Sequence, residues 1–247
     1  MGAGFAIRAK ANKTAEVMIY EDVGAGWFGG VSAKQFADDL KGLGDVTHID
    51  VRLNSYGGDV FDGLAIYNQL VQHKASVTTH VDGVAASIAS IIAMAGNEIH
   101  IAESGWLMIH DAWGMAIGNA DELRRQAELM DSVSEQLANV YVARTGHSLE
   151  QVRAWMADET WMNAGDAIGR KFASVMSENL RVAAHASLDR YRFRHAPQAL
   201  SAAAPAKQMP VVKLSAEEVA LRDRVAGQRA SLSRAHVMTE LKSRGAA

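Results

Sequence analysis

The sequence alternates between segments typical of β-strands and segments typical of helices, and this order constrains the fold more than any other feature. Residues 16–21 predict a strand, and residues 32–44 predict a helix with one apolar face. Residues 48–53 alternate apolar and polar side chains, and a glycine turn then leads into a second helix at 60–71. The pattern continues with strands expected at 76–81, 98–102 and 106–110 and a buried helix at 87–96. Because strands that alternate with helices form a mostly parallel sheet covered by helices, the expected fold class is α/β.

The longest predicted helix follows residue 119. Asn119 and Glu122 have the spacing of a capping box, and Gly146 lies where a helix C-terminus needs a left-handed residue. The apolar side chains of this helix recur at helical spacing and form one stripe of Met130, Val133, Leu137, Val140 and Tyr141. Ser148 and Gln151 predict the start of another helix.

The composition is that of a folded protein, with 49% hydrophobic and 21% charged residues. The absence of cysteine excludes disulfides, thiolate metal sites and a cysteine nucleophile. The sequence contains no window of 18 uncharged apolar residues, and its N-terminus lacks the apolar segment of a signal peptide. We therefore expect a soluble, cytoplasmic protein with no membrane partner.

The C-terminal quarter of the chain differs from the rest. Residues 185–247 hold 11 Lys and Arg against 5 Asp and Glu, and all three prolines lie within residues 196–210, a stretch too poor in large apolar residues to pack. The aromatic pair Tyr191 and Phe193 stands alone there without a nucleic-acid motif, so nucleic-acid binding is not expected. The expected organisation is a folded domain at 1–190, a proline-bearing linker at 191–214 and a basic helical tail at 215–247.

Ser87 is the candidate nucleophile. It follows the small residues of DGVAA and stands at the expected start of a helix, where unpaired N–H groups and the positive end of the helix dipole can stabilise an oxyanion. Ser90 is one turn further on and should be buried. From this segment alone, packing or capping explains Ser87 as well as catalysis does.

A serine nucleophile needs a base, and His110 is the candidate because it ends the strand WLMIH. His48, His80 and His100 lie within strand patterns, and a strand-end histidine can equally be structural. The third group of a triad is a carboxylate that orients the imidazole. The spacing leaves Asp158 and Glu159 open for this role.

Two other site classes match the sequence poorly. Residues 24–29 (GAGWFG) have the formal spacing of a dinucleotide-binding turn, but Trp27 and Phe28 stand where the backbone should approach a pyrophosphate. The sequence has no HExxH motif and no P-loop. We therefore expect neither a cofactor nor a metal.

Five motifs in one order resemble the Clp protease proteolytic subunit family, and within it the Clp-like head-maturation proteases of tailed phages and prophages. The resemblance covers residues 15–182. It implies the Clp/crotonase-like fold, a spiral of β-β-α units with a protruding handle helix, and peptide hydrolysis by a Ser-His-acid triad. The motifs are NSYGGDVFDGLAIYNQL, DGVAASIAS, WLMIH, TGHSLEQV and ETWMNAGDA.

The resemblance implies a role for each matching residue. The family's nucleophile falls on Ser87, its histidine on His110 and its aspartate on Glu159, with Asp158 as the alternative acid. Its oxyanion donors are main-chain N–H groups.

These donors fall on Gly58 and on Ile88, the residue after the nucleophile. A glycine suits the first position because only glycine lets the main chain come that close to a scissile carbonyl.

The family also implies partners. The long helix at 119–145 corresponds to the handle through which two rings join, so a ring-forming homo-oligomer is expected. The phage-like motifs imply cleavage of scaffold or capsid proteins during prohead maturation. The alternative is a housekeeping Clp subunit that works with an ATPase unfoldase. A crotonase-like acyl-CoA enzyme and a capsid component with a dead triad are less favoured.

Overall fold

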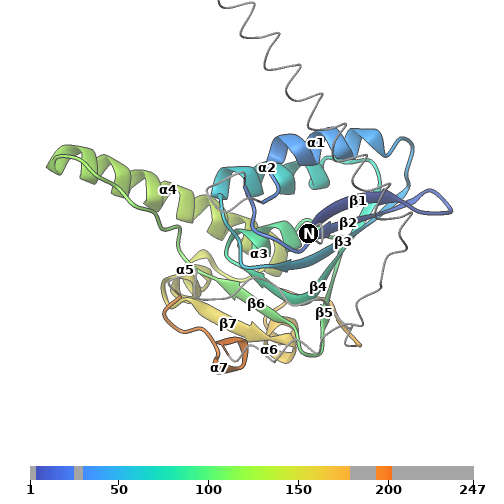
Figure 1. Cartoon of the computed structure of the whole chain (residues 1–247). Coiled ribbons are helices and arrows are strands. Elements are labelled where there is room, and N and C mark those ends of the chain that lie inside the picture. Colours follow the sequence, from blue (N-terminus) through green and yellow to red (C-terminus); the bar gives the residue numbers. More distant parts are fainter. Residues whose placement is uncertain (1–3, 25–29, 179–192, 202–247) are drawn as a thin grey trace, which may run out of the picture. The chain divides into compact units, whose positions relative to one another are not determined.

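The structure is a computed structural model that describes residues 4–24, 30–178 and 193–201 (Figure 1). The first compact unit of the chain runs from Met1 to Ala203. The expected tail helix at 215–247 and most of the GAGWFG turn lie outside the described residues, as does most of the expected linker. The predicted domain boundaries therefore stay predictions.

An eight-stranded sheet forms the centre of this unit, and most of its strand pairs are parallel, as predicted. Its main path runs β1-β2-β3-β4-β5-β8, with only the first pair antiparallel. β6 leaves this path, pairing with β4 in parallel and with β7 in antiparallel orientation. The strands are β1 (Phe5–Ala9), β2 (Thr14–Ile19), β3 (His48–Ser55), β4 (Ser76–Ala86), β5 (Glu98–Ala102), β6 (Trp106–Ile109), β7 (Thr160–Asn163) and β8 (Val175–Ser177).

α1 and α2 run side by side along the sheet, while α5 and α6 lie next to β7 (Figure 1). The predicted capping box of α4 forms in full, and Gly146 ends the helix with φ of 73°. At α1, the side chain of Ser32 caps the helix by accepting the N–H of Gln35. The described helices are α1 (Ala33–Gly42), α2 (Val60–Val71), α3 (Ile88–Ala93), α4 (Ala120–Thr145), α5 (Leu149–Ala157), α6 (Ala164–Gly169) and α7 (Gln198–Ser201).

The core lies between the sheet and the helices. Along β3 the side chains of Ile49, Val51 and Leu53 are fully buried, while the alternate residues Asp50 and Arg52 are partly exposed on the other face. This is the two-residue period that the sequence predicts for a half-buried strand. The core therefore fixes the register of β3 and, through it, the position of the loop that follows Ser55.

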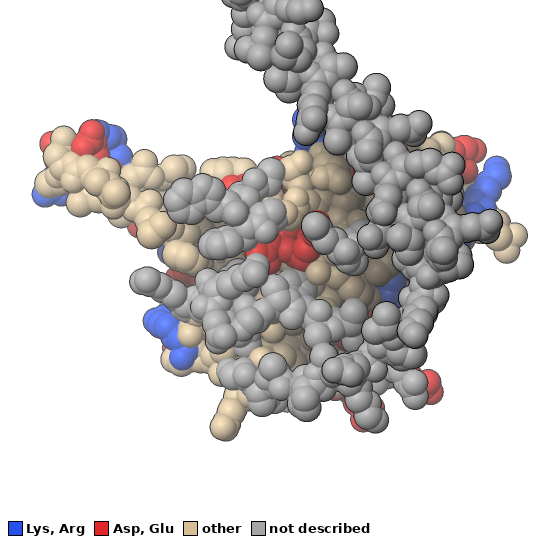
Figure 2. Space-filling view, in the orientation of Figure 1, with Lys and Arg blue, Asp and Glu red and all other residues tan. Residues whose placement is uncertain are grey.

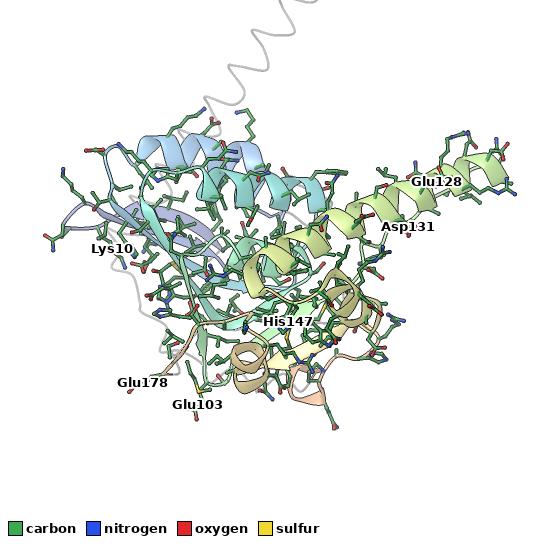
Figure 3. The ribbon with its side chains drawn as sticks, turned by 180° about the vertical axis from the view of Figure 1, so that it is seen from behind. Lys10, Glu103, Glu128, Asp131, His147 and Glu178 are labelled. Atoms are coloured by element: carbon green, nitrogen blue, oxygen red, sulfur yellow. The ribbon has the colours of Figure 1, made fainter. Side chains whose placement is uncertain are left out.

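Only the C-terminal half of α4 packs on the body of the protein. Val133, Leu137 and Tyr141 are buried, whereas Leu123 and Leu129 are 43% and 49% exposed. The N-terminal half projects away from the body, with charged side chains of both signs at its tip (Figures 1 and 2). Figure 3 shows Glu128 and Asp131 along this projecting part. The predicted stripe of Met130, Val133, Leu137, Val140 and Tyr141 is buried or partly buried throughout, and the exposed Leu123 and Leu129 lie before it in the sequence.

Among the helices that the structure describes, none combines the length and apolar character needed to cross a bilayer.

Candidate active site

Ser87 lies at the junction of β4 and α3, as the residue just before the helix. The sequence placed it in the first helical turn, but the helix begins at Ile88 and Ser87 has φ of 55° and ψ of −130°. A left-handed φ is uncommon for a residue with a side chain and is often found at functional sites. The Ser87 hydroxyl does not cap the helix, so it is available for another interaction.

Ser90 has a different environment, and it is buried as predicted. Its hydroxyl donates to the carbonyl oxygen of Ser87 at 2.5 Å and accepts from the Tyr141 hydroxyl at 2.7 Å. Burial raises the pKa of Tyr141, which keeps the phenol protonated as a donor. Ser90 therefore fixes the main chain at Ser87 and does not compete as a nucleophile.

His110 meets Ser87 in the folded protein. The distance from His110 Nε2 to Ser87 Oγ is 2.8 Å, although 23 residues separate them in sequence. The main chain explains the approach, because β4 and β6 pair in parallel and the N–H of Ser87 donates to the carbonyl oxygen of Met108 at 3.0 Å. Beyond His110, the N–H of Ala112 donates to Ser134 Oγ of α4 at 3.0 Å. Hydrogen bonds of the main chain two residues before His110 and two residues after it therefore fix its position.

The environment of His110 keeps its imidazole neutral near pH 7. Burial lowers the pKa of His110, the negative charge of Glu159 opposes this effect, and the positive charge of Arg194 adds to it. A neutral imidazole whose Nε2 accepts the Ser87 hydroxyl carries its own proton on Nδ1. This is the protonation state that a general base requires.

Glu159 lies opposite His110, as the strand register requires. Ile109 pairs with Thr160 at the end of the antiparallel β6–β7 ladder, so one further step on each strand places His110 across from Glu159. The Glu159 side chain is buried, with 4% of its surface exposed, whereas Asp158 is exposed at the C-terminus of α5. Of the two open candidates, the structure brings Glu159 to the histidine.

Three N–H groups hold the Glu159 carboxylate. Oε1 accepts from the Trp161 indole at 3.2 Å and from the main chain of His195 at 2.7 Å, and Oε2 accepts from the main chain of Arg194 at 2.8 Å. Burial opposes ionisation, but these donors and the nearby His110 outweigh it and lower the pKa of Glu159. Among the described residues, the interaction between Glu159 and His110 is electrostatic, without a hydrogen bond.

The sequence did not single out Trp161, Arg194 or His195 as site residues. Trp161 lies two residues from Glu159 on β7, and strand alternation places such residues on the same face, so it could have been found. Arg194 and His195 lie beyond the domain boundary expected near residue 190, in a region whose composition predicts a linker.

Gly57 approaches Ser87, and Gly58 approaches Val23, more closely than a residue with a side chain could. A Cβ on Gly57 would lie 2.8 Å from the Ser87 Cβ, and a Cβ on Gly58, with φ of 144°, would lie 2.1 Å from the Val23 carbonyl oxygen. Val23 bonds to the residues on either side of Gly58, through the Gly57 carbonyl and the Asp59 N–H. The Gly58 N–H takes part in neither of these two hydrogen bonds with Val23.

The N–H of Ile88 is also free of a helical partner, because Ile88 is the first residue of α3. A pocket next to Ser87 includes both candidate oxyanion donors and is lined by Gly58, Val60, Ser87, Ile88, His110, Ala112, Trp113, Leu137 and Tyr141.

Within the described ranges, no group of three or more His, Asp or Glu side chains has an arrangement that could hold a metal ion.

Comparison with known proteins places the chain in a family. The family model for Clp protease matches residues 5–174. The ATP-dependent Clp protease proteolytic subunits of Oltmannsiellopsis viridis and Pleurastrum terricola are each 32% identical over 120 residues, which is 47% of this chain and 61% of the relative. The chain thus spans less than two thirds of the length of these relatives.

A solved structure agrees in fold. A point mutant of ClpP1 from Listeria monocytogenes superposes with a TM-score of 0.58 and 22% identity, covering 68% of this chain and 92% of that one. The sheet with its covering helices is therefore the ClpP/crotonase-like fold expected from the sequence. Because the family model matches more than half of its length, the chain belongs to the Clp protease family.

Proposed function

We propose that this chain is a serine endopeptidase subunit in which Ser87 is the nucleophile, His110 the general base and Glu159 the acid. The 2.8 Å contact between Ser87 Oγ and His110 Nε2 carries the proposal. The Ser87 hydroxyl does not cap α3, so it is free to bind the histidine. Burial lowers the pKa of His110, so the imidazole is neutral and can accept the proton. These are the properties that activate a serine for attack on a carbonyl.

The reaction is acyl transfer. His110 Nε2 takes the proton of Ser87 Oγ as the oxygen attacks the scissile carbonyl, and the Gly58 and Ile88 amides donate to the resulting oxyanion. The imidazolium then protonates the leaving amine. A water molecule, deprotonated by the same nitrogen, hydrolyses the acyl-enzyme. Glu159 stabilises the imidazolium in both steps by its negative charge.

A serine-directed fluorophosphonate tests this proposal. Mass spectrometry should find the adduct on Ser87, and Ser87→Ala should lose both the adduct and peptide cleavage while keeping its thermal midpoint. Ser132→Ala on the exposed face of α4 is a matched control that should behave as the parent chain. Cleavage that persists in Ser87→Ala would contradict the assignment.

The proposed assembly is a homo-oligomeric ring that works with an ATPase unfoldase in the cytoplasm. Both relatives are named ATP-dependent, which supports an ATPase partner. The half of α4 that projects with Leu123 and Leu129 exposed supports a contact with another subunit. Sedimentation should give a mass several times 26.5 kDa. A 26.5 kDa species at working concentration would contradict the ring.

Prohead maturation is the more specific proposal, and its support is the likeness of GDVFDGLAIYN, VDGVAAS and ETW to phage-like members of the family. The relatives' names favour the ATPase-coupled role over prohead maturation.

Incubation with scaffold and capsid proteins, with and without an ATPase partner, separates the two roles. A crotonase-like activity would require acyl-CoA binding, and a dead structural component would fail to label at Ser87.

A further inference from the structure

A short segment far along the chain lies against the candidate triad. The Phe193 ring centroid is 5.9 Å from that of His110 and 5.3 Å from that of Trp161, both in edge-on geometry. It is also 6.3 Å from the Tyr56 ring, next to the Gly57–Gly58 turn. Residue 193 therefore packs on the base itself and on the turn that carries a proposed oxyanion donor.

The two following residues bind the turn that carries the acid. Their main-chain N–H groups donate to Glu159, and their side chains bind the carbonyl oxygens just before it. Arg194 Nη2 donates to Ala157 O at 2.7 Å, and His195 Nδ1 donates to Asp158 O at 2.8 Å. Four hydrogen bonds thus join two residues of the segment to three consecutive residues of the turn.

We propose that residues 193–195 are part of the active site, with the N–H groups of Arg194 and His195 holding the Glu159 carboxylate opposite His110. This inference rests on the proposed function. Arg194 and His195 act through Glu159 and are positioning residues.

The hydrogen-bond capacity of the carboxylate supports a positioning role over an inhibitory one. An ionised carboxylate has about four acceptor sites, and the three described donors leave one of them for a histidine N–H. That site is on Oε2, which accepts one hydrogen bond, from the Arg194 N–H, and forms an ion pair with Arg194 Nε at 3.9 Å, whereas Oε1 accepts from both Trp161 and His195. The Glu159 side chain has one more rotatable bond than aspartate, and its main chain has φ of 50°. The hydrogen bonds from Arg194 and His195 therefore help to keep the carboxylate in one orientation.

Proline substitutions in the full chain test the N–H groups directly, because proline removes the donor. His195→Pro and Arg194→Pro are each compared with the alanine variant at the same position, which loses the side chain but keeps the N–H. Ala196→Pro controls for added rigidity, since the N–H of Ala196 donates to none of the described residues. Thermal unfolding of each variant checks that it folds.

We expect kcat for a model peptide to fall about tenfold or more in each proline variant relative to its alanine partner, with KM unchanged. Loss of a donor also raises the pKa of Glu159. The further fall in kcat that follows protonation of Glu159, on the acidic side of the limb set by His110, should then begin at higher pH in the proline variants and at the parent's pH in Ala196→Pro. A purely structural contact would change stability without moving the pH of this fall.

Hydrogen exchange gives a readout independent of turnover. The amides of Arg194 and His195 should be protected in the parent and in Ser87→Ala, and should lose protection in Glu159→Ala. A reactive parent whose proline and alanine variants have equal kcat would overturn this inference alone, and a higher kcat in the proline variants would show an inhibitory segment. A parent that neither cleaves peptides nor labels at Ser87 would overturn the proposed function and this inference with it.

Discussion

Ile109 faces Thr160 in the last pair of the β6–β7 ladder, and this pairing places His110 opposite Glu159. The strand that ends just before the candidate base therefore lies beside the strand that begins just after the candidate acid. A slip of one residue in this register would place Asp158 opposite His110 in place of Glu159. The side chain of Glu159 would then point to the other face of the sheet. The choice of acid is thus a property of strand pairing.

Removal of the charge on the acid should reduce turnover strongly. Glu159→Gln keeps the shape but leaves no negative charge to stabilise the imidazolium, so we expect kcat to fall about 10³-fold to 10⁴-fold, as found for triads of this kind. Asp158→Asn, on the exposed neighbour, should lose far less. Peptide hydrolysis near neutral pH measures both. Equal losses in the two variants would mean that the register does not select the acid.

The pH dependence should reflect a histidine that burial keeps neutral. Because the pKa of His110 is lowered from 6.5, activity should be fully present at neutral pH and lost only as the pH falls through this lower value. The acidic limb of kcat/KM should therefore have its midpoint below 6.5. A midpoint above 6.5 would mean that the charge of Glu159 outweighs the burial of His110.

Gly58, a proposed oxyanion donor, should tolerate no side chain. In Gly58→Ala the added Cβ would collide with the Val23 carbonyl oxygen, and φ of 144° is unfavourable for alanine. We expect a loss of about 2 kcal/mol or more in the free energy of unfolding, together with loss of labelling at Ser87. Gly169→Ala is the control, because its Cβ would meet no atom within 4 Å.

Urea unfolding of the two glycine variants gives the comparison. Gly169→Ala should change the free energy of unfolding by less than about 1 kcal/mol. A Gly58→Ala chain as stable and as reactive as the parent would show that the turn can move aside, and that its N–H is not held in place for the oxyanion.

The bond between Ser90 and Tyr141 should appear as a coupling energy. Ser90→Ala leaves the buried Tyr141 hydroxyl without its partner and should cost about 1–3 kcal/mol of stability. Tyr141→Phe in the same chain removes that orphaned hydroxyl, so the double variant should lose less than the sum of the two single losses. Fluorophosphonate should still label Ser87 in all three. Strict additivity would mean that the two hydroxyls do not interact.

The sequence predicts the helices well where capping residues mark their ends. Asn119 with Glu122 and Gly146 delimit α4, and the mostly parallel sheet follows from the order of elements. β1 was not predicted, because its five residues gain their structure from pairing with β2. The Ser87–His110 contact was anticipated from the family resemblance, since it depends on the parallel alignment of β4 and β6.

Two features of the site could not be predicted from local spacing because they depend on long-range contacts, although the family resemblance placed the acid on Glu159. The composition around Arg194 predicts a linker, and nothing near it indicates a bond to a carboxylate 35 residues earlier in the chain. Phe193 stood out only as an isolated aromatic residue. The choice between Asp158 and Glu159 likewise needed the register of β7 against β6, which local spacing does not contain.

The contacts around Ser87 and Glu159 also bear on when the site can work. The serine meets its base across 23 residues, and the carboxylate meets its main-chain donors across 35 and 36. Contacts that close such long loops are costly in entropy, and they form together with the rest of the tertiary structure rather than before it. A chain that is still partly unfolded therefore has the groups of the candidate site scattered, and the proposed peptidase activity would arise only when folding is complete.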